Sequence, residues 1–184
     1  MKHVYLIRHA LPDFPEGERM CLGRTDLPLG HEGLAQAEAM ARSLPPVTRV
    51  YSSPLRRAIQ TARAVGEPVI LRDLQEMSAG EWDGLTFREI RARYPELYAA
   101  RGRDKTLALP GGEPASQALP RFRKALTRAV REAPGDVAVV AHGGIMALFL
   151  GTLDGVGRKP DYCQIIPLVW ADDTFTIQED ESHA

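Results

Sequence analysis

The feature that most constrains the fold is a repeated alternation of short apolar segments with amphipathic ones. Residues 137–141 (VAVVA) form a continuous apolar run that leads directly into His142, two glycines and an apolar helical stretch at 145–153. Unbroken apolar strands that alternate with helices are typical of a parallel sheet covered on both faces. The sequence therefore predicts an α/β fold with a mainly parallel sheet and helices on both faces. Further strands are expected at 3–7, 47–52, 69–71, 163–170 and 174–178.

Helix signals lie between these strands. Over residues 31–44, apolar side chains recur at spacings of three and four, which predicts a helix with one buried face. Ser53 and Pro54 predict the start of a second helix, with the serine as its cap and the proline at its first position. That helix is expected to run to about residue 65.

The second half of the chain carries further helix and loop signals. Thr86 and Glu89 form a capping box, which predicts a helix that ends before Pro95. Another amphipathic helix is expected over 119–130, although Pro120 leaves its first residue open. Glycines and prolines predict loops, and a loop longer than about 12 to 15 residues is usually functional. These loops are expected at 10–30, at 76–85 and, as a mobile segment, at 102–115.

Length and composition describe an ordinary globular protein. The 184 residues suit one domain, and 44% apolar with 26% charged residues excludes disordered, fibrous and disulfide-scaffold classes. The formal net charge of −1 excludes a general basic field for nucleic acid. Only four of the 23 basic residues are lysines, so the chain is rich in arginine and a local anion site is worth seeking.

Three further absences bear on compartment and ligands. The chain has no run of about 18 apolar residues, as a membrane span requires, and its N-terminus reaches Arg8 too early for a signal peptide. Cys21 and Cys163 do not form a Cys-x-x-Cys pair. No histidines and cysteines have the short spacing of a structural zinc site. We therefore expect a cytoplasmic protein with no membrane partner and no metal.

Three residue pairs fall where this topology places its ligand crevice. Arg8 and His9 follow the first strand, His142 and Gly143 follow the 137–141 strand, and Arg56–Arg57 lies near the start of the second helix. Ligands of such folds bind at the carboxyl ends of the strands, so these side chains should converge. Imidazoles and guanidiniums beside the free amides of a helix beginning at Gly143 predict an anion site, most simply for phosphate. Spacing alone does not choose between the two neighbouring arginines, which point about 100° apart on a helix.

Such a site can transfer phosphate without a metal or cofactor. A neutral imidazole can attack phosphorus if a hydrogen bond on its other ring nitrogen fixes the tautomer. The guanidiniums would neutralise the equatorial oxygens. Departure of an alcohol needs a proton donor. Glu76 is the best candidate, because it ends a strand-like segment before a glycine-rich loop, and the same carboxylate could then activate water.

Four ordered motifs resemble the histidine phosphatase superfamily, the phosphoglycerate mutase-like group. They are 6–9 (LIRH), 51–62 (YSSPLRRAIQTA), 74–76 (LQE) with 80–84 (GEWDG), and 140–144 (VAHGG). The resemblance covers nearly the whole chain. It implies a three-layer α/β sandwich without a metal, with one domain over 1–184 and a small helical lid around 86–115.

The resemblance also implies a role for each matching residue. His9 resembles the phosphorylated nucleophile, Arg8, Arg57 and His142 resemble phosphate ligands, and Glu76 resembles the proton donor. On the same ground Arg57 is preferred over its neighbour, which is expected to be a solvated surface charge.

Two positions depart from the family pattern. Ala10 stands where the family usually has glycine, and Pro15 stands where many members have asparagine six residues after the nucleophile. A different residue must supply the lost amide contact, or the contact is absent. Within the superfamily, residues 21–29 (CLGRTDLPL) look most like α-ribazole phosphatases, so Gly23 and Arg24 are assigned to substrate binding. Arg24 either binds substrate or pairs with Asp26 at the surface.

The favoured function is a metal-independent phosphomonoesterase that acts through a phosphohistidine on a small phosphorylated metabolite, with α-ribazole 5′-phosphate of the cobalamin pathway as the first guess. A phosphoglycerate mutase is the second hypothesis, although 94–116 looks too short for the extra lid segment of mutases. The third is a phospho-ligand binding protein without turnover. The expected partner is a small-molecule phosphomonoester and not nucleic acid, and a homodimer is left open. Four side chains have plainer interpretations: Cys21 as an apolar filler, Trp82 as core, and His3 and His31 as structural or exposed.

Overall fold

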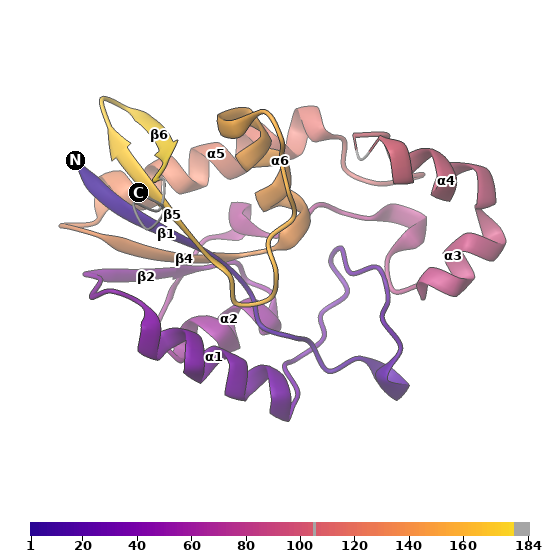
Figure 1. The fold of residues 1–184 in the computed structure, drawn as a ribbon, viewed down its shortest axis with the longest axis horizontal. Coiled ribbons are helices and arrows are strands. Elements are labelled where there is room, and N and C mark those ends of the chain that lie inside the picture. The colour runs from indigo at the N-terminus through magenta and orange to yellow at the C-terminus, as the bar shows by residue number, and fades with distance from the viewer. Residues whose placement is uncertain (105, 179–184) are drawn as a thin grey trace, which may run out of the picture.

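The computed structural model describes residues 1–104 and 106–178. The acidic composition from Glu179 onward also predicts a frayed tail, but this tail, with His183, lies outside the described residues. At the centre is one six-stranded sheet in the order β3-β2-β4-β1-β5-β6 (Figure 1). The strands are β1 (Lys2–Arg8), β2 (Arg49–Ser52), β3 (Val69–Ile70), β4 (Val137–Ala141), β5 (Ile165–Ala171) and β6 (Thr174–Ile177).

The sheet is parallel except at one edge. β1 and β2 both run parallel to β4, and β3 runs parallel to β2. β5 pairs antiparallel with β1, and β6 pairs antiparallel with β5. Because β1, β2 and β4 run in the same direction, their carboxyl ends meet at one edge of the sheet. The chain continues from that edge into His9, Ser53 and His142.

Helices cover both faces of the sheet, as predicted. Figure 1 shows α1 and α2 below the sheet and α5 and α6 above it. Alternate strand residues serve the two layers: Val50 and Val140 pack in the cluster that holds Met40 of α1, whereas Val139 packs in the cluster that holds Phe122 of α5. The helices are α1 (His31–Ser43), α2 (Arg56–Arg63), α3 (Phe87–Arg93), α4 (Pro95–Arg103), α5 (Ala115–Glu132) and α6 (Gly143–Asp154). The described part of the chain contains no helix that is both long enough and apolar enough to cross a membrane.

The predicted start of the second helix is wrong. Helix α2 begins at Arg56 with Leu55 as its N-cap, and it ends at Arg63. The Ser53 hydroxyl accepts a hydrogen bond of 3.3 Å from the Leu55 amide. The same hydroxyl makes a shorter contact, of 2.6 Å, with the His142 ring. The local sequence pattern predicts Ser53 as a helix cap, but in the structure its hydroxyl makes its shorter contact with the ring of the remote His142.

Two other helix signals in the sequence agree with the structure. The capping box is present: the Thr86 hydroxyl accepts from the Glu89 amide at 3.1 Å, and the Glu89 carboxylate accepts from the Thr86 amide at 2.8 Å. Helix α5 begins at Ala115, before Pro120, and continues through the proline to Glu132.

Helices α3 and α4 lie beyond one end of the sheet (Figure 1). They pack on Trp82, which is buried as expected, with ring centroids 6.1 Å from Tyr94 and 6.3 Å from Tyr98. The following segment, expected to be mobile, is hydrogen-bonded at its far end. The Pro110 carbonyl accepts from the Glu81 amide at 2.9 Å, so this end is joined to the loop that follows Glu76.

Candidate active site

His9 comes directly after β1 and is buried, with 5% of its surface exposed. Its Nδ1 lies 2.7 Å from the Ala10 carbonyl. A carbonyl can only accept, so Nδ1 carries the proton and Nε2 keeps its lone pair. Burial, followed by the positive charge of Arg57, holds the pKa of His9 well below its ordinary value. His9 is thus a neutral imidazole in a fixed tautomer, as the predicted mechanism requires.

Arg57 lies in the first turn of α2 and is fully buried. Its Nη1 donates to the Thr25 carbonyl at 2.7 Å, and its Nη2 donates to the Gly23 carbonyl at 2.9 Å. Its neighbour Arg56 is exposed, as expected of a solvated surface charge. The long loop that contains Gly23 and Thr25 therefore meets helix α2 at the Arg57 guanidinium.

Arg8, the last residue of β1, points into the same region. Its Nη1 donates to the Pro160 carbonyl at 2.7 Å, and its guanidinium lies 3.8 Å from the centre of the Tyr162 ring. The Tyr162 ring lies 5.6 Å from the His9 ring. Burial lowers the pKa of Arg8 and of Arg57, although a guanidinium stays charged in a protein. Neither forms an ion pair with a carboxylate among the residues that the structure describes.

His142 is the N-cap of α6 and is fully buried. Its ring centre lies 5.1 Å from that of His9. Burial, followed by Arg57, holds the pKa of His142 well below its ordinary value. If the Ser53 hydroxyl donates to Nε2, the proton of this neutral ring is on Nδ1, which is then a donor.

Three buried nitrogens around His9 have no hydrogen-bond partner within the described part of the chain. They are Arg8 Nε, Arg57 Nε and His142 Nδ1. A buried donor without a partner costs about 1 to 3 kcal/mol, and most such groups in proteins are paired. Donors of this kind, two of them on guanidiniums, suit an anion that accepts from all three.

Glu76 is brought to the same end of the sheet, with 8% of its surface exposed. It follows a short 3-10 turn, Arg72–Leu74, and not a strand as expected. Its carboxylate accepts three backbone hydrogen bonds, from Met77 at 2.9 Å and from Gly144 and Ile145 at 2.8 Å each. The favourable field at the N-terminus of α6 therefore acts on this carboxylate.

This arrangement corrects the expectation of free helix amides at Gly143. The second and third amides of α6 are occupied by Glu76. A Cβ on Gly144 would lie 2.9 Å from the Glu76 carboxylate, and one on Gly143 would lie 2.5 Å from Lys159 and 2.9 Å from Arg8 Nε. The two glycines are thus needed for close approach of charged groups to the helix end.

Lys159 and Tyr162 were missed by the sequence analysis. Both lie in the connection between α6 and β5, which carries no motif, and nothing local marks it as part of the site. The Lys159 side chain lies against Gly143, and its positive charge helps to lower the pKa of His9.

The two residues assigned from loop 21–29 are placed differently from each other. The Gly23 amide donates to Asp83 at 2.9 Å and its carbonyl accepts from Arg57, so Gly23 supports the site guanidinium and offers no free amide. Arg24 lies with its Nη2 3.4 Å from the Glu113 carboxylate. Asp26 instead accepts from the backbone amide of the exposed neighbour of Arg57, at 2.7 Å, so the proposed surface pair with Arg24 is wrong.

The structure also places other residues that the sequence analysis singled out, among them two histidines, a cysteine and a proline. Burial raises the pKa of Cys21 to about 11, so its thiol is not a ready nucleophile. His3 pairs with Asp136, and His31 is exposed at the start of α1. Pro15 lies exposed in a 3-10 turn. The described residues contain no group of three or more His, Cys, Asp or Glu that could hold a metal ion.

Known proteins are similar along nearly the whole chain. Residues 4–180 match the sequence profile of the histidine phosphatase superfamily (branch 1). Phosphoglycerate mutase-like protein 4 of Arabidopsis thaliana is 32% identical over 155 residues, 78% of this chain and 67% of that protein. The glucosyl-3-phosphoglycerate phosphatase of Mycobacterium tuberculosis is 34% identical over 169 residues, 83% and 75% of the two chains. Three other mycobacterial relatives are 36% identical, and the matched segment spans 40% of their length.

A solved structure agrees with the fold. The mycobacterial glucosyl-3-phosphoglycerate phosphatase Rv2419c in complex with VO3 superposes with a TM-score of 0.84 at 29% sequence identity. The superposition covers 97% of this chain and 98% of that one. The six-stranded α/β sandwich is therefore the fold of that phosphatase.

The burial of the His9 and His142 imidazoles predicts how the two rings titrate. Ring ¹⁵N NMR should show His9 and His142 still neutral at pH 6, where a histidine of ordinary pKa near 6.5 is mostly protonated, with His9 as the Nδ1–H tautomer. Because the unfolded chain then binds more protons than the folded one, these groups lower the free energy of unfolding as pH falls below about 6.5. His9→Ala assigns the signals, and titration of either ring at or above pH 6.5 would contradict the buried placement.

Proposed function

The chain belongs to the histidine phosphatase superfamily and is a phosphatase, and we propose that it hydrolyses small phosphomonoesters through a phosphohistidine formed on His9. The observation that carries this proposal is the set of unpartnered buried nitrogens around a neutral imidazole of fixed tautomer. A phosphate group supplies the acceptors and the negative charge that these donors lack. No step of the proposed chemistry requires a metal ion.

In the first step, His9 Nε2 attacks phosphorus. The Nε2–P bond forms, the bond from phosphorus to the ester oxygen breaks, and its electron pair passes to the departing alkoxide. Glu76 gives that oxygen a proton and becomes the carboxylate that accepts hydrogen bonds from the α6 amides. Arg8, Arg57 and His142 donate to the equatorial oxygens, where negative charge is spread in the transition state.

In the second step, water attacks the phosphohistidine. The Glu76 carboxylate takes a proton from the water, the N–P bond breaks, and Nε2 recovers its lone pair. The products are inorganic phosphate and the alcohol, and both His9 and the protonated Glu76 are restored. Throughout, the hydrogen bond from Nδ1 to the Ala10 carbonyl holds the ring in place.

The alcohol half of the substrate has two candidates. Residues 21–29 resemble the corresponding loop of α-ribazole phosphatases, which favours α-ribazole 5′-phosphate. The mycobacterial relatives named glucosyl-3-phosphoglycerate phosphatase favour a phosphorylated glycerate derivative. We propose that Arg24, 44% exposed at the site margin, contacts this part of the substrate, and that the α3–α4 pair acts as a lid.

A mutase is the second candidate function, supported by the relative named phosphoglycerate mutase-like protein 4. A mutase must return the phosphate of the phosphohistidine to its substrate and keep water away from it. Trp82, Tyr94 and Tyr98 pack together beside α3 and α4, but only Trp82 is buried, and this packing does not distinguish the two activities.

The phosphohistidine is testable directly. A quenched reaction with ³²P-labelled ester should leave label on the protein that is stable in base and lost in acid, and His9→Ala should remove both label and turnover. Because the proposed steps use no metal, EDTA should leave p-nitrophenyl phosphate hydrolysis unchanged. His31→Ala, at an exposed histidine of α1, is the matched control and should be fully active. An active His9→Ala variant would overturn the proposed nucleophile.

Arg57 and Arg56 form a second matched pair. Loss of one preorganised oxyanion donor costs about 2.7 to 4 kcal/mol, so Arg57→Ala should lower kcat by roughly a hundredfold or more. Arg56→Ala removes the same charge from an exposed position and should stay within about twofold of the unaltered protein. Steady-state kinetics on one ester suffices. Equal losses in the two variants would exclude a specific role for the buried guanidinium.

A substrate panel identifies the alcohol. It contains α-ribazole 5′-phosphate, glucosyl-3-phosphoglycerate, 3-phosphoglycerate, sugar phosphates and nucleoside monophosphates, each compared by kcat/KM. One ester should exceed the others by at least about tenfold, since pocket contacts discriminate on this scale. Isomerisation of 3-phosphoglycerate with 2,3-bisphosphoglycerate would instead identify a mutase, and a flat profile would show that the loop selects no particular alcohol.

A further inference from the structure

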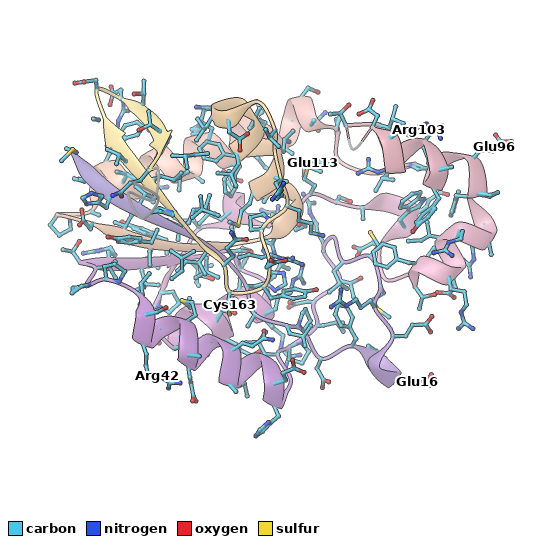
Figure 2. All side chains as sticks on the ribbon, in the orientation of Figure 1. Glu16, Arg42, Glu96, Arg103, Glu113 and Cys163 are labelled. Atoms are coloured by element: carbon cyan, nitrogen blue, oxygen red, sulfur yellow. The ribbon has the colours of Figure 1, made fainter. Side chains whose placement is uncertain are left out.

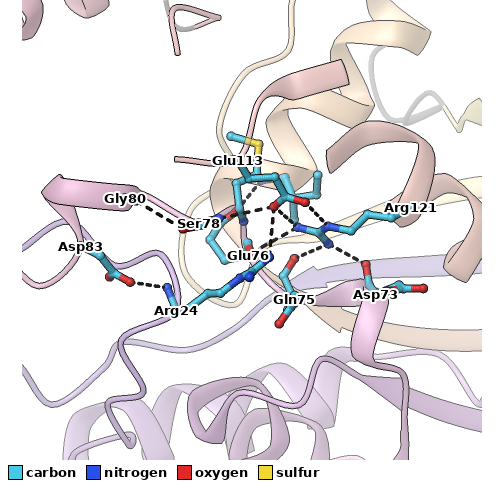
Figure 3. A network of polar contacts seen from close by, with 11 residues as sticks. Arg24, Asp73, Gln75, Glu76, Ser78, Gly80, Asp83, Glu113 and Arg121 are labelled. Atoms are coloured by element: carbon cyan, nitrogen blue, oxygen red, sulfur yellow. Dashed lines mark hydrogen bonds and ion pairs between the residues drawn. The ribbon is translucent and has the colours of Figure 1, made fainter. Parts of the chain in front are cut away.

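A nearly buried ion pair lies beside the Glu76 segment, outside the phosphate site itself. Arg121 of α5 grips Glu113 with two parallel contacts, Nε to Oε1 at 2.6 Å and Nη2 to Oε2 at 2.7 Å (Figure 3). The two side chains are 15% and 11% exposed. In Figure 2, Glu96 and Arg103 lie at the outer end of the molecule on α4, whereas Glu113 lies nearer the middle of the view. The pair is therefore unlike the exposed ion pairs of the helix surfaces.

The rest of the Arg121 guanidinium binds the main chain that leads to Glu76. Nη1 donates to the carbonyls of Asp73 at 2.7 Å and Gln75 at 2.8 Å, and Nη2 donates to the Glu76 carbonyl at 3.2 Å. Figure 3 shows these contacts converging on one side of the guanidinium. One side chain thus fixes three carbonyls within a four-residue stretch that belongs to no strand or long helix.

The Arg121–Glu113 ion pair, called the clamp below, is also attached to the chain that follows Glu76, through Glu113. Its amide donates to the Ser78 carbonyl at 2.9 Å, and its Oε2 lies 3.4 Å from the Ser78 amide. Residues before and after Glu76 are therefore attached to one ion pair. The carboxylate of Glu76 is held separately, by the amides at the start of α6.

We propose that Arg121 is a positioning residue for the proton donor Glu76, with Glu113 holding its guanidinium in the required orientation. The proposal rests on the role given to Glu76 in the proposed function. Two rigid helices then locate the donor: α6 through the carboxylate and α5 through the backbone. A planar fork with several donors in fixed directions can serve a carboxylate and three carbonyls together, which a lysine ammonium cannot.

A positioning role predicts a loss that depends on the leaving group. p-Nitrophenolate departs without a proton, whereas an alkoxide from an alkyl phosphate needs one. Misplacement of a catalytic group by about 1 Å can cost about a hundredfold. Displacement of Glu76 should therefore lower kcat/KM for an alkyl ester far more than kcat/KM for p-nitrophenyl phosphate. The ratio kcat/KM covers the steps up to departure of the leaving group, whereas kcat also includes the later attack of water, in which Glu76 serves both esters alike.

The test compares Arg121→Lys and Glu113→Gln with the unaltered protein on p-nitrophenyl phosphate and glycerol 2-phosphate. We expect kcat/KM on the alkyl ester to fall by roughly 10- to 100-fold and kcat/KM on the aryl ester by less than about threefold. Arg128→Lys and Glu132→Gln alter an exposed ion pair on the same helix, with Arg128 Nε 2.7 Å from Glu132 Oε1, and should change neither rate. The ratio of the two rates within one preparation does not depend on the fraction of folded enzyme.

Glu76→Gln provides the reference for interpretation. If it discriminates between the esters but both clamp variants slow them equally, the clamp is only structural and the proposal is wrong. If Glu76→Gln itself fails to discriminate between the esters in kcat/KM, the proton-donor role is wrong, while the phosphohistidine label still tests His9 independently. Unaltered rates on both esters in both clamp variants would likewise overturn the proposal.

Discussion

The burial of a positive charge without a carboxylate partner is the constraint on which the site depends. Arg57 is fully buried, and transfer of an ion from water to a protein interior costs several kcal/mol. Two carbonyls of the long loop, from Gly23 and Thr25, offset part of this cost. The loop must therefore wrap around the guanidinium, and Asp83 holds it there by accepting from the amides of Gly23, Arg24 and Thr25. Carbonyl dipoles leave the net charge in place, which suits an anionic ligand.

Burial first, and the same charge second, lower the pKa of the two histidines. Burial and the field of the guanidiniums both act against protonation of His9 and His142 and lower the pKa of each. A neutral ring with Nδ1 bound to a carbonyl is a nucleophile at Nε2 without any base beside it. In the proposed mechanism, anion binding and activation of the nucleophile thus depend on one electrostatic field.

Glu76 occupies the helix terminus that an α/β protein often offers to its ligand. The amides of Gly144 and Ile145 bind the carboxylate. In the proposed mechanism, the positive end of α6 thus organises the proton donor, and the arginines supply the charge for the phosphate. The clamp formed by Arg121 and Glu113 is consistent with this division of labour, because it connects the donor segment to the opposite helix layer. The proposed proton donor and the proposed phosphate ligands are thereby supported by separate elements.

Much of the fold was predictable because its signals are local. Strand length, helical periodicity and the capping box at Thr86 depend on residues that are close in the chain, and the structure confirms them. The order of motifs also led to His9, Arg57 and His142, since parallel strands bring their carboxyl ends together whatever the details of the loops. Arg57 was separable from its neighbour only through the family pattern.

What the sequence by itself determined was the α/β layering and the identity of the residues at the ends of the strands. Only the tertiary structure decided that Ser53 contacts His142, that Glu76 takes the α6 amides, and that Lys159 and Tyr162 join the site. These contacts join residues remote in the chain, and no periodicity or cap records them. A side chain with several hydrogen-bonding choices takes the partner that packing brings closest, and that partner is defined only once the layers have assembled.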